Sequence, residues 1–397
     1  MLNKKGQREL AYGVKVEEIK PLEGYDRVEY ARIGSGWWCV VKKDDFKVGD
    51  TAVYFEIDSK LPEKPEFEFC AKYKYRVKTQ KLCKVISQGL LMHPRDLNLK
   101  DIKEGDFLTE KLGVTYYEAE DNTRKADVSR YTSMKARHQK FFKTKLGKWL
   151  MKKEWGRKLC FLFLGKKKDK KTDWPNWVVK TDEERAQNVF NQMKALGDIW
   201  WIATEKIDGS STTLTMKQDN PKKRKHLICS RNVVYDKPEK EEKNFYKDTD
   251  GNIYLEMAEK YHTEELCKKI LDDHKDWEYI TIQGETYGGK IQQRDYGKEH
   301  RCAIFNIIYK KEGEAPVRLN PLEMHKFLLK YEEFGLEGVP IVDMIKLPET
   351  CEELLEYAGK EKSRIDGGMR EGIVLRSIDG KWSFKAVDNN YLLKYHS

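Results

Sequence analysis

One lysine in this sequence stands where it can act as a nucleophile. Lys206 lies in the segment Thr204 to Ser211, directly after the apolar run Ile199 to Ala203, which predicts a buried strand. A free lysine titrates near ~10.4 and cannot attack an electrophile at neutral pH. Burial and neighbouring cations lower the pKa of such an amine and permit covalent catalysis. The alternative is a simple charged β-turn, because Asp-Gly is a common turn dipeptide.

Five further segments downstream of Lys206 each place a polar or aromatic residue at or near a predicted strand. Carboxylates, cations and an aromatic ring are the groups needed to bind a metal ion, phosphates and a base. The residues concerned are Arg231 and Asn232 after a short apolar run, Glu285 after the run 280–284, Phe305 within 303–309, Glu371 and Arg376 on either side of 372–375, and Lys385 within 382–387.

The order and content of these segments resemble the covalent nucleotidyltransferase superfamily, which comprises polynucleotide ligases and mRNA capping enzymes. The resemblance covers residues 174–397. Within the superfamily it is similar to ATP-dependent RNA ligases with an N-terminal OB domain. Ser211 stands where DNA ligases and capping enzymes usually carry an arginine, and Lys180 to Asn188 is similar to a segment of RNA ligases.

The resemblance implies an α+β fold, in which an N-terminal OB-type β-barrel precedes an adenylation domain of the DNA ligase (ATP-grasp-like) type with antiparallel sheets and flanking helices. It also implies roles for the site residues. Lys206 would accept AMP from ATP, while Asp208, Glu285 and Glu371 would hold Mg²⁺ or Mn²⁺, largely through water. The residues expected to contact the nucleotide are Glu205, Ile207, Arg231, Asn232, Glu285, Phe305, Glu371, Arg376, Lys385 and Gln187.

The chain is expected to divide into three parts. Residues 1–118 alternate short apolar runs with turn signals and predict a small barrel, an OB-fold or an SH3-like alternative. Residues 119–173 are rich in lysine and aromatics, and form either a helical platform for phosphates or a solvated linker. Residues 174–397 form the adenylation domain. The predicted helices there are 183–196, 255–272, 320–332 and 351–362.

Composition narrows the class of protein. The 397 residues carry a net charge of +10, which is compatible with a nucleic-acid partner. No apolar run approaches the ~18 residues of a membrane span, so we expect a soluble cytoplasmic or nuclear protein without a membrane partner. We also expect a monomer. None of the eight cysteines stands at Cys-x-x-Cys spacing, which argues against a zinc site.

The expected function is ATP-dependent joining of RNA 3′-hydroxyl and 5′-phosphate ends, with a nick in a duplex during RNA repair as the expected substrate. Two other interpretations stay open. The chain can be a DNA ligase or a capping guanylyltransferase with rearranged domains. In a different class, it can be a non-catalytic RNA-binding protein that keeps a degenerate transferase fold.

Overall fold

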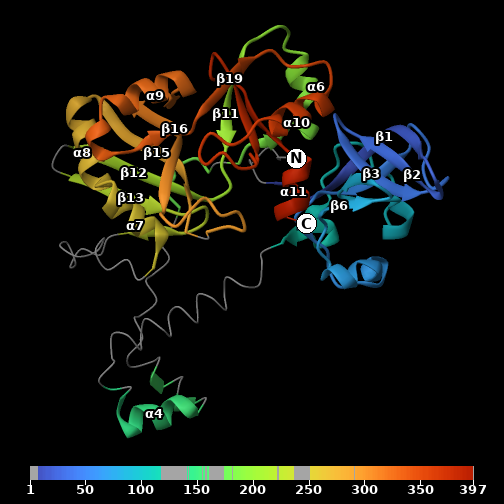
Figure 1. Cartoon of the computed structure of the whole chain (residues 1–397), viewed down its shortest axis with the longest axis horizontal. Coiled ribbons are helices and arrows are strands. Elements are labelled where there is room, and N and C mark those ends of the chain that lie inside the picture. The colour runs from blue at the N-terminus through green and yellow to red at the C-terminus, as the bar shows by residue number, and fades with distance from the viewer. Residues whose placement is uncertain are drawn as a thin grey trace. The chain divides into compact units, whose positions relative to one another are not determined.

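The structure is a computed structural model of the chain. It describes residues 8–117, 141, 143–153, 155–156, 159–160, 174–180, 182–220, 223–236, 251–289 and 291–396. The chain forms two compact units, one of residues 1–116 with 174–397 and the other of residues 117–173 (Figure 1). In the second unit the structure describes one named helix, α4 (Lys145–Lys152). Most of the predicted basic segment 119–173 lies outside the described residues.

The N-terminal part is a five-stranded barrel sheet, as an OB-fold requires. Its strands lie in the order β3-β2-β1-β4-β8. Alternate residues of these strands, such as Tyr12, Val14 and Val16, are buried in a common core. The strands are β1 (Ala11–Leu22), β2 (Tyr25–Ile33), β3 (Trp37–Lys42), β4 (Thr51–Phe55) and β8 (Leu90–Met92). Shorter elements are β5 (Ser59–Lys60), η1 (Pro65–Tyr73), η2 (Pro94–Leu97), α1 (Thr109–Leu112) and β9 (Thr115–Tyr116).

One of the apolar runs within residues 1–118, residues 82–86, does not form a single strand. This stretch is a tight hairpin between β6 (Thr79–Leu82) and β7 (Val85–Gln88). Cys83 and Lys84 at its tip have φ of 50° and 67°, the left-handed conformation that two-residue hairpin turns need. Neither cysteine nor lysine is typical of such a turn. The sequence of residues 82–86 therefore does not show where one strand ends and the next begins.

The adenylation part contains two larger sheets, in which all neighbouring strands are antiparallel except β10 with β21 and β16 with β18. The five-stranded sheet consists of β10 (Glu184–Arg185), β21 (Ser383–Val387), β20 (Gly372–Ser377), β11 (Trp201–Lys206) and β19 (Ile341–Ile345). The other consists of β14 (Val234–Asp236), β13 (Lys223–Cys229), β12 (Ser210–Asn220), β15 (Trp277–Tyr287), β16 (Arg301–Lys311) and β17 (Val317–Arg318), with β18 (Glu337–Gly338) beside β16.

Helices cover these sheets, and Figure 1 shows three of them, α7 to α9, beside β12 to β16. The helices are α6 (Ala186–Lys194), α7 (Ile253–Lys260), α8 (Thr263–Asp273), α9 (Pro321–Leu329), η3 (Glu332–Phe334), α10 (Cys351–Lys360) and α11 (Asn389–Tyr395). The single helix predicted for 255–272 is wrong, because His262 adopts φ of 44° and separates α7 from α8. Asn320 caps α9 in a reciprocal capping box with Glu323. No helix in the described part of the chain is long and apolar enough to cross a membrane.

Candidate active site

The register between β11 and β20 places a carboxylate beside Lys206. Lys206 is the last residue of β11 and pairs with Gly372, the first residue of β20, so Glu371 lies next to the lysine. The Lys206 Nζ is 2.7 Å from Glu371 Oε1. The Lys206 side chain is 25% exposed and that of Glu371 is 8% exposed, so the amine is reachable while its partner is buried.

The turn after Lys206 brings two more carboxylates to the same place. Asp208 is buried in this turn, and Ser211 in the following strand β12 pairs with Glu285 in β15. A Cβ on Gly209 would lie 2.3 Å from the carbonyl oxygen of Thr286, so only glycine lets the turn lie this close to β15. The Asp-Gly pair is therefore required by close packing, and it fixes Asp208 and Glu285 around the lysine.

The three carboxylates govern the charge of the site. Burial raises the pKa of Glu285 to about 8; the Lys206 ammonium opposes this rise, and the Glu371 and Asp208 carboxylates add to it. Burial alone would lower the pKa of Lys206, but Glu371, Glu285 and Asp208 outweigh burial and raise it. In the protein alone, the expectation of a lowered lysine pKa is therefore wrong in direction. Lys206 is an ammonium held by Glu371.

These carboxylates suit a divalent cation bound through water. Carboxylate oxygens are the ligands that Mg²⁺ and Mn²⁺ prefer, and a cation here would favour the ionised form of Glu285, whose pKa is raised first by burial and then by the Glu371 and Asp208 carboxylates. Among the described residues, no group of three or more His, Cys, Asp or Glu side chains is close enough to hold a metal ion directly. The residues fit the predicted metal with water in its coordination shell.

A second group of charges surrounds Asp182. Its Oδ1 is 2.9 Å from the Nζ of Lys385 on β21, and its Oδ2 is 3.1 Å from Nη2 of Arg231. Burial opposes ionisation of Asp182, but Lys385, Arg8 and Arg231 lower its pKa to about 2. Burial lowers the pKa of Lys385 to about 8, against the pull of Asp182 and with help from Arg8, Arg185 and Lys206. The carboxylate thus stands among cations that could equally bind a phosphate.

Arg376 does not join this group. On β20 it pairs with Ile202, four residues from the Gly372 that faces Lys206, a separation of about 13 Å along a strand. Its Nη1 donates to the Phe305 carbonyl at 3.2 Å and its Nη2 to Asn306 Oδ1 at 2.8 Å. Burial, with the nearby Arg318, lowers the pKa of Arg376 to about 10. The structure gives Arg376 partners that tie β20 to β16.

Phe305 protrudes from a β-bulge. Gln283 pairs with Asn306 and Gly284 with Ile304, so Phe305 is an extra residue between two ladder pairs. A bulge re-aims the side chain it carries. Phe305 is partly buried against the core of the larger sheet. This arrangement is compatible with a ring that stacks on a base.

The other predicted nucleotide contacts have their own partners. The Glu205 carboxylate accepts hydrogen bonds from Ser363 Oγ and, at 2.7 Å, from Arg364 N, while Ile207 is buried in the core. Asn232 Oδ1 accepts from Lys180 Nζ at 3.4 Å. Gln187 is buried on α6, and its carbonyl oxygen accepts from Ser35 N of the barrel. Gln187 therefore lies against the barrel and not among the three carboxylates.

Several residues of the site gave no local signal in the sequence. Asp182 was not selected, although the segment around it was. Tyr296 Oη accepts a hydrogen bond from Asp208 N at 3.0 Å, and Tyr391 and His396 both contact the Asp208 carboxylate. Each lies 88 or more residues away from Asp208 in sequence, so only the fold brings them together.

A cavity of about 470 Å³ lies near the turn that holds Asp208. Tyr296 and Arg364 line this cavity, but Lys206 does not.

Comparisons with known proteins identify the family. An OB-fold domain profile matches residues 10–94 and an RNA ligase profile matches residues 199–396. An apo variant of Naegleria gruberi RNA ligase is 27% identical with a TM-score of 0.73, covering 97% of this chain and 97% of that chain. Another variant, with ATP and Mn, is 26% identical with a TM-score of 0.72, covering 98% and 100%.

The same enzyme with PPi is 27% identical, with a TM-score of 0.71 over 97% of this chain and 98% of that chain. No curated protein matches the sequence. The predicted order of a barrel followed by a ligase-type domain is confirmed along with the predicted family. The chain belongs to the RNA ligase family and carries an OB-fold domain on the N-terminal side of its ligase domain.

Proposed function

We propose that this chain is an ATP-dependent RNA ligase that joins a 3′-hydroxyl to a 5′-phosphate through a lysyl-AMP intermediate. The observation that carries the proposal is the placement of Lys206 at a strand end among Asp208, Glu285 and Glu371. Naegleria gruberi RNA ligase, which is similar over nearly the whole chain, has been solved with ATP and Mn and with AMP and Mn. These ligands match the chemistry of the four side chains.

In the first step, Lys206 Nζ forms a bond to the α-phosphorus of ATP as the bond to pyrophosphate breaks. Nζ must first lose a proton, and Glu371 Oε1, 2.7 Å away, is within hydrogen-bond reach of that proton. Asp208, Glu285 and Glu371 would hold a divalent cation through water, and its positive charge would disfavour the ammonium and neutralise the phosphates. The lysine, protonated in the protein alone, becomes nucleophilic only once that charge balance changes.

In the later steps AMP passes to the RNA 5′-phosphate, and the 3′-hydroxyl then displaces AMP. Lys385 and Arg231 are cations that can bind the phosphates in the first step and in these later ones, when a phosphate replaces Asp182 as their partner. Phe305 is the proposed stacking partner of adenine, and backbone groups of Glu205 and Ile207 lie beside the nucleophile. We also propose that Arg376, Asn232 and Gln187 contact the nucleotide, but with weaker support. Arg376 and Asn232 already have hydrogen-bond partners within the protein, and Gln187 lies against the barrel.

The proposed substrate is a nicked duplex with RNA on the 3′-hydroxyl side, in RNA repair. An OB-fold barrel is a common nucleic-acid-binding module, and this one adjoins the adenylation domain within the same compact unit. We propose the division into residues 1–118, 119–173 and 174–397 for binding, linkage and catalysis, and a monomeric enzyme acting on RNA ends.

The experiment is incubation of the full chain with labelled ATP or GTP and Mg²⁺ or Mn²⁺, followed by a denaturing gel. Label from ATP on the wild type, and none on Lys206→Ala, is expected. Label from GTP instead would identify a guanylyltransferase, and no label would favour a non-catalytic RNA-binding protein. Sealing of nicked duplexes with RNA or DNA on either side of the nick then separates an RNA ligase from a DNA ligase.

A further inference from the structure

The helix α11 is fixed at both ends next to the catalytic residues. Its N-cap, Asp388, accepts hydrogen bonds from Asn390 N and Tyr391 N through its carboxylate. The Asp388 backbone N–H donates to the Glu371 carbonyl at 2.9 Å. The start of the helix is therefore tied to the residue that holds Lys206.

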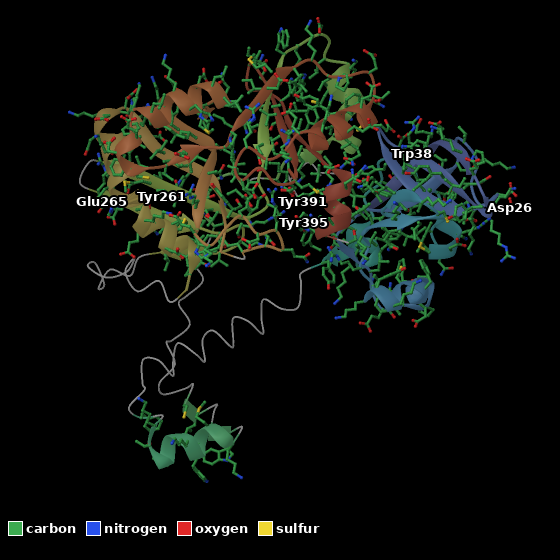
Figure 2. All side chains as sticks on the ribbon, viewed as in Figure 1. Asp26, Trp38, Tyr261, Glu265, Tyr391 and Tyr395 are labelled. Carbon is green, nitrogen blue, oxygen red and sulfur yellow. The ribbon has the colours of Figure 1, made fainter. Side chains whose placement is uncertain are left out.

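The far part of the helix reaches Asp208. Tyr391 Oη donates to Asp208 Oδ2 at 2.9 Å, and His396 Nε2 lies 3.3 Å from the same oxygen. No hydrogen bond to Asp208 Oδ1 is found within the described part of the chain. Two donors on Oδ2 fix the rotation of the carboxylate and leave Oδ1 available to a cation. Figure 2 shows Tyr391 on this helix, together with its neighbour Tyr395.

Burial and ring packing hold the Tyr391 side chain in this position. Tyr391 is 0% exposed, its ring packs on that of Tyr395 at 4.6 Å, and the Arg294 guanidinium lies 6.0 Å from its centroid. Arg294 is itself held by Asp366 and by the Met369 carbonyl, close in sequence to Glu371. A hydroxyl this constrained positions its acceptor in one orientation.

The same helix is also part of the barrel. Leu392 of α11 and Val387 just before it are buried in the barrel core with residues such as Val14 and Leu91. Arg76 of the barrel lies 3.5 Å from the His396 carbonyl oxygen. The helix thus joins the barrel to Asp208 by continuous buried contacts.

We propose that Tyr391 and His396 are positioning residues that orient the Asp208 carboxylate toward the divalent cation, and that packing of α11 in the barrel core sustains this orientation. The inference rests on the proposed function, because it assumes a cation at Asp208. It assigns a role in the active site to residues outside every motif of the sequence.

The test compares Tyr391→Phe with Tyr395→Phe in the full chain. Tyr391→Phe removes one hydroxyl that donates to a carboxylate, and the loss of one such bond corresponds to about tenfold or more in equilibrium. We expect the rate of AMP attachment to fall by about tenfold at limiting Mn²⁺ and to recover at saturating Mn²⁺. Tyr395→Phe, whose hydroxyl forms no hydrogen bond among the described residues, should behave as the wild type.

A second measurement does not depend on activity. In a Lys206→Ala background, which cannot turn over, Mn²⁺ binding with ATP present is followed by electron paramagnetic resonance. Adding Tyr391→Phe should weaken Mn²⁺ binding by about threefold to tenfold, and His396→Ala should weaken it less because its contact is longer and more exposed.

The inference is overturned if Tyr391→Phe binds Mn²⁺ as tightly as its parent, or if its rate falls equally at all Mn²⁺ concentrations together with a lower melting temperature. The second outcome would show that the hydroxyl only stabilises the fold. A wild type that accepts no AMP would instead overturn the proposed function, so the two failures are distinguishable.

Discussion

The two ends of strand β20 hold charged residues in opposite ways. At the Gly372 end, Lys206, Glu371, Glu285 and Asp208 crowd together; burial raises the pKa of Glu285, and the carboxylates raise the pKa of Lys206 against burial. At the other end, the Arg376 guanidinium donates to a carbonyl and an amide of β16. The two motif residues concerned are Glu371, directly before this six-residue strand, and Arg376, near its end. The comparison indicates that one end serves chemistry and the other secures the packing of two sheets.

The largest effect that tests this comparison is expected for Lys385→Ala. Lys385 lies near Lys206 and has Asp182 as its partner, where a phosphate can take the place of the carboxylate. Its loss should reduce the rate of AMP attachment by about 100-fold to 1,000-fold, as for other groups that stabilise transition-state charge. Single-turnover labelling measures this. A loss of rate no greater than that of Arg376→Met would refute the distinction.

Arg376→Met should act on stability instead. The variant leaves Asn306 Oδ1 and the Phe305 carbonyl without their buried donor, which costs about 2 to 4 kcal/mol. Denaturant unfolding measures this loss. AMP attachment well below the melting temperature should stay within about fivefold of the wild type, because the guanidinium makes no contact at the lysine end.

Phe305→Leu tests whether the adenine base of ATP stacks on this ring. Loss of an aromatic stack corresponds to about threefold to tenfold in affinity, so the KM for ATP should rise by that factor while kcat changes little. Steady-state pyrophosphate release measures both constants. Unchanged KM would mean that Phe305 only fills the core.

The last test concerns pH. Glu285 keeps its proton in the folded protein up to about 8, but in the unfolded chain it loses that proton near its ordinary pKa of 4.5. The folded state therefore binds more protons in this window, so wild-type stability falls as pH rises from 4.5 to 8. Glu285→Gln cannot lose a proton and should lack this decline. In metal-free buffer, its melting temperature relative to wild type should rise with pH; a constant difference would contradict the assignment.

The sequence predicted the parts of the site that lie within single strands or turns. Lys206, Glu285 and Glu371 are adjacent to apolar runs, and the pairing of those runs brings the three side chains together. The direction in which the pKa of Lys206 shifts could not be predicted from these runs. It depends on how closely three carboxylates from different strands converge, which local sequence does not express.

Other features were missed for equally physical reasons. The break at His262 and the hairpin tip at Cys83 both need positive φ at residues that rarely adopt it, so tertiary packing overrides the local preference. Gln187 was selected from a resembling segment, but its carbonyl oxygen accepts from Ser35 of the barrel, while Asp182 and Arg185 of that segment lie beside Lys385. Which face of a short segment meets the site is decided only by the assembled sheets.

The shared core of the barrel and α11 has a consequence for synthesis of the protein on the ribosome. The barrel strands are translated first, yet two residues of the barrel core, Val387 and Leu392, are translated about 300 residues after β8 ends at Met92. During translation the core of the barrel is therefore incomplete, and apolar surface stays exposed until the strand β21 and the helix α11 emerge. Activity should consequently appear only when residues 387–396 have left the exit tunnel.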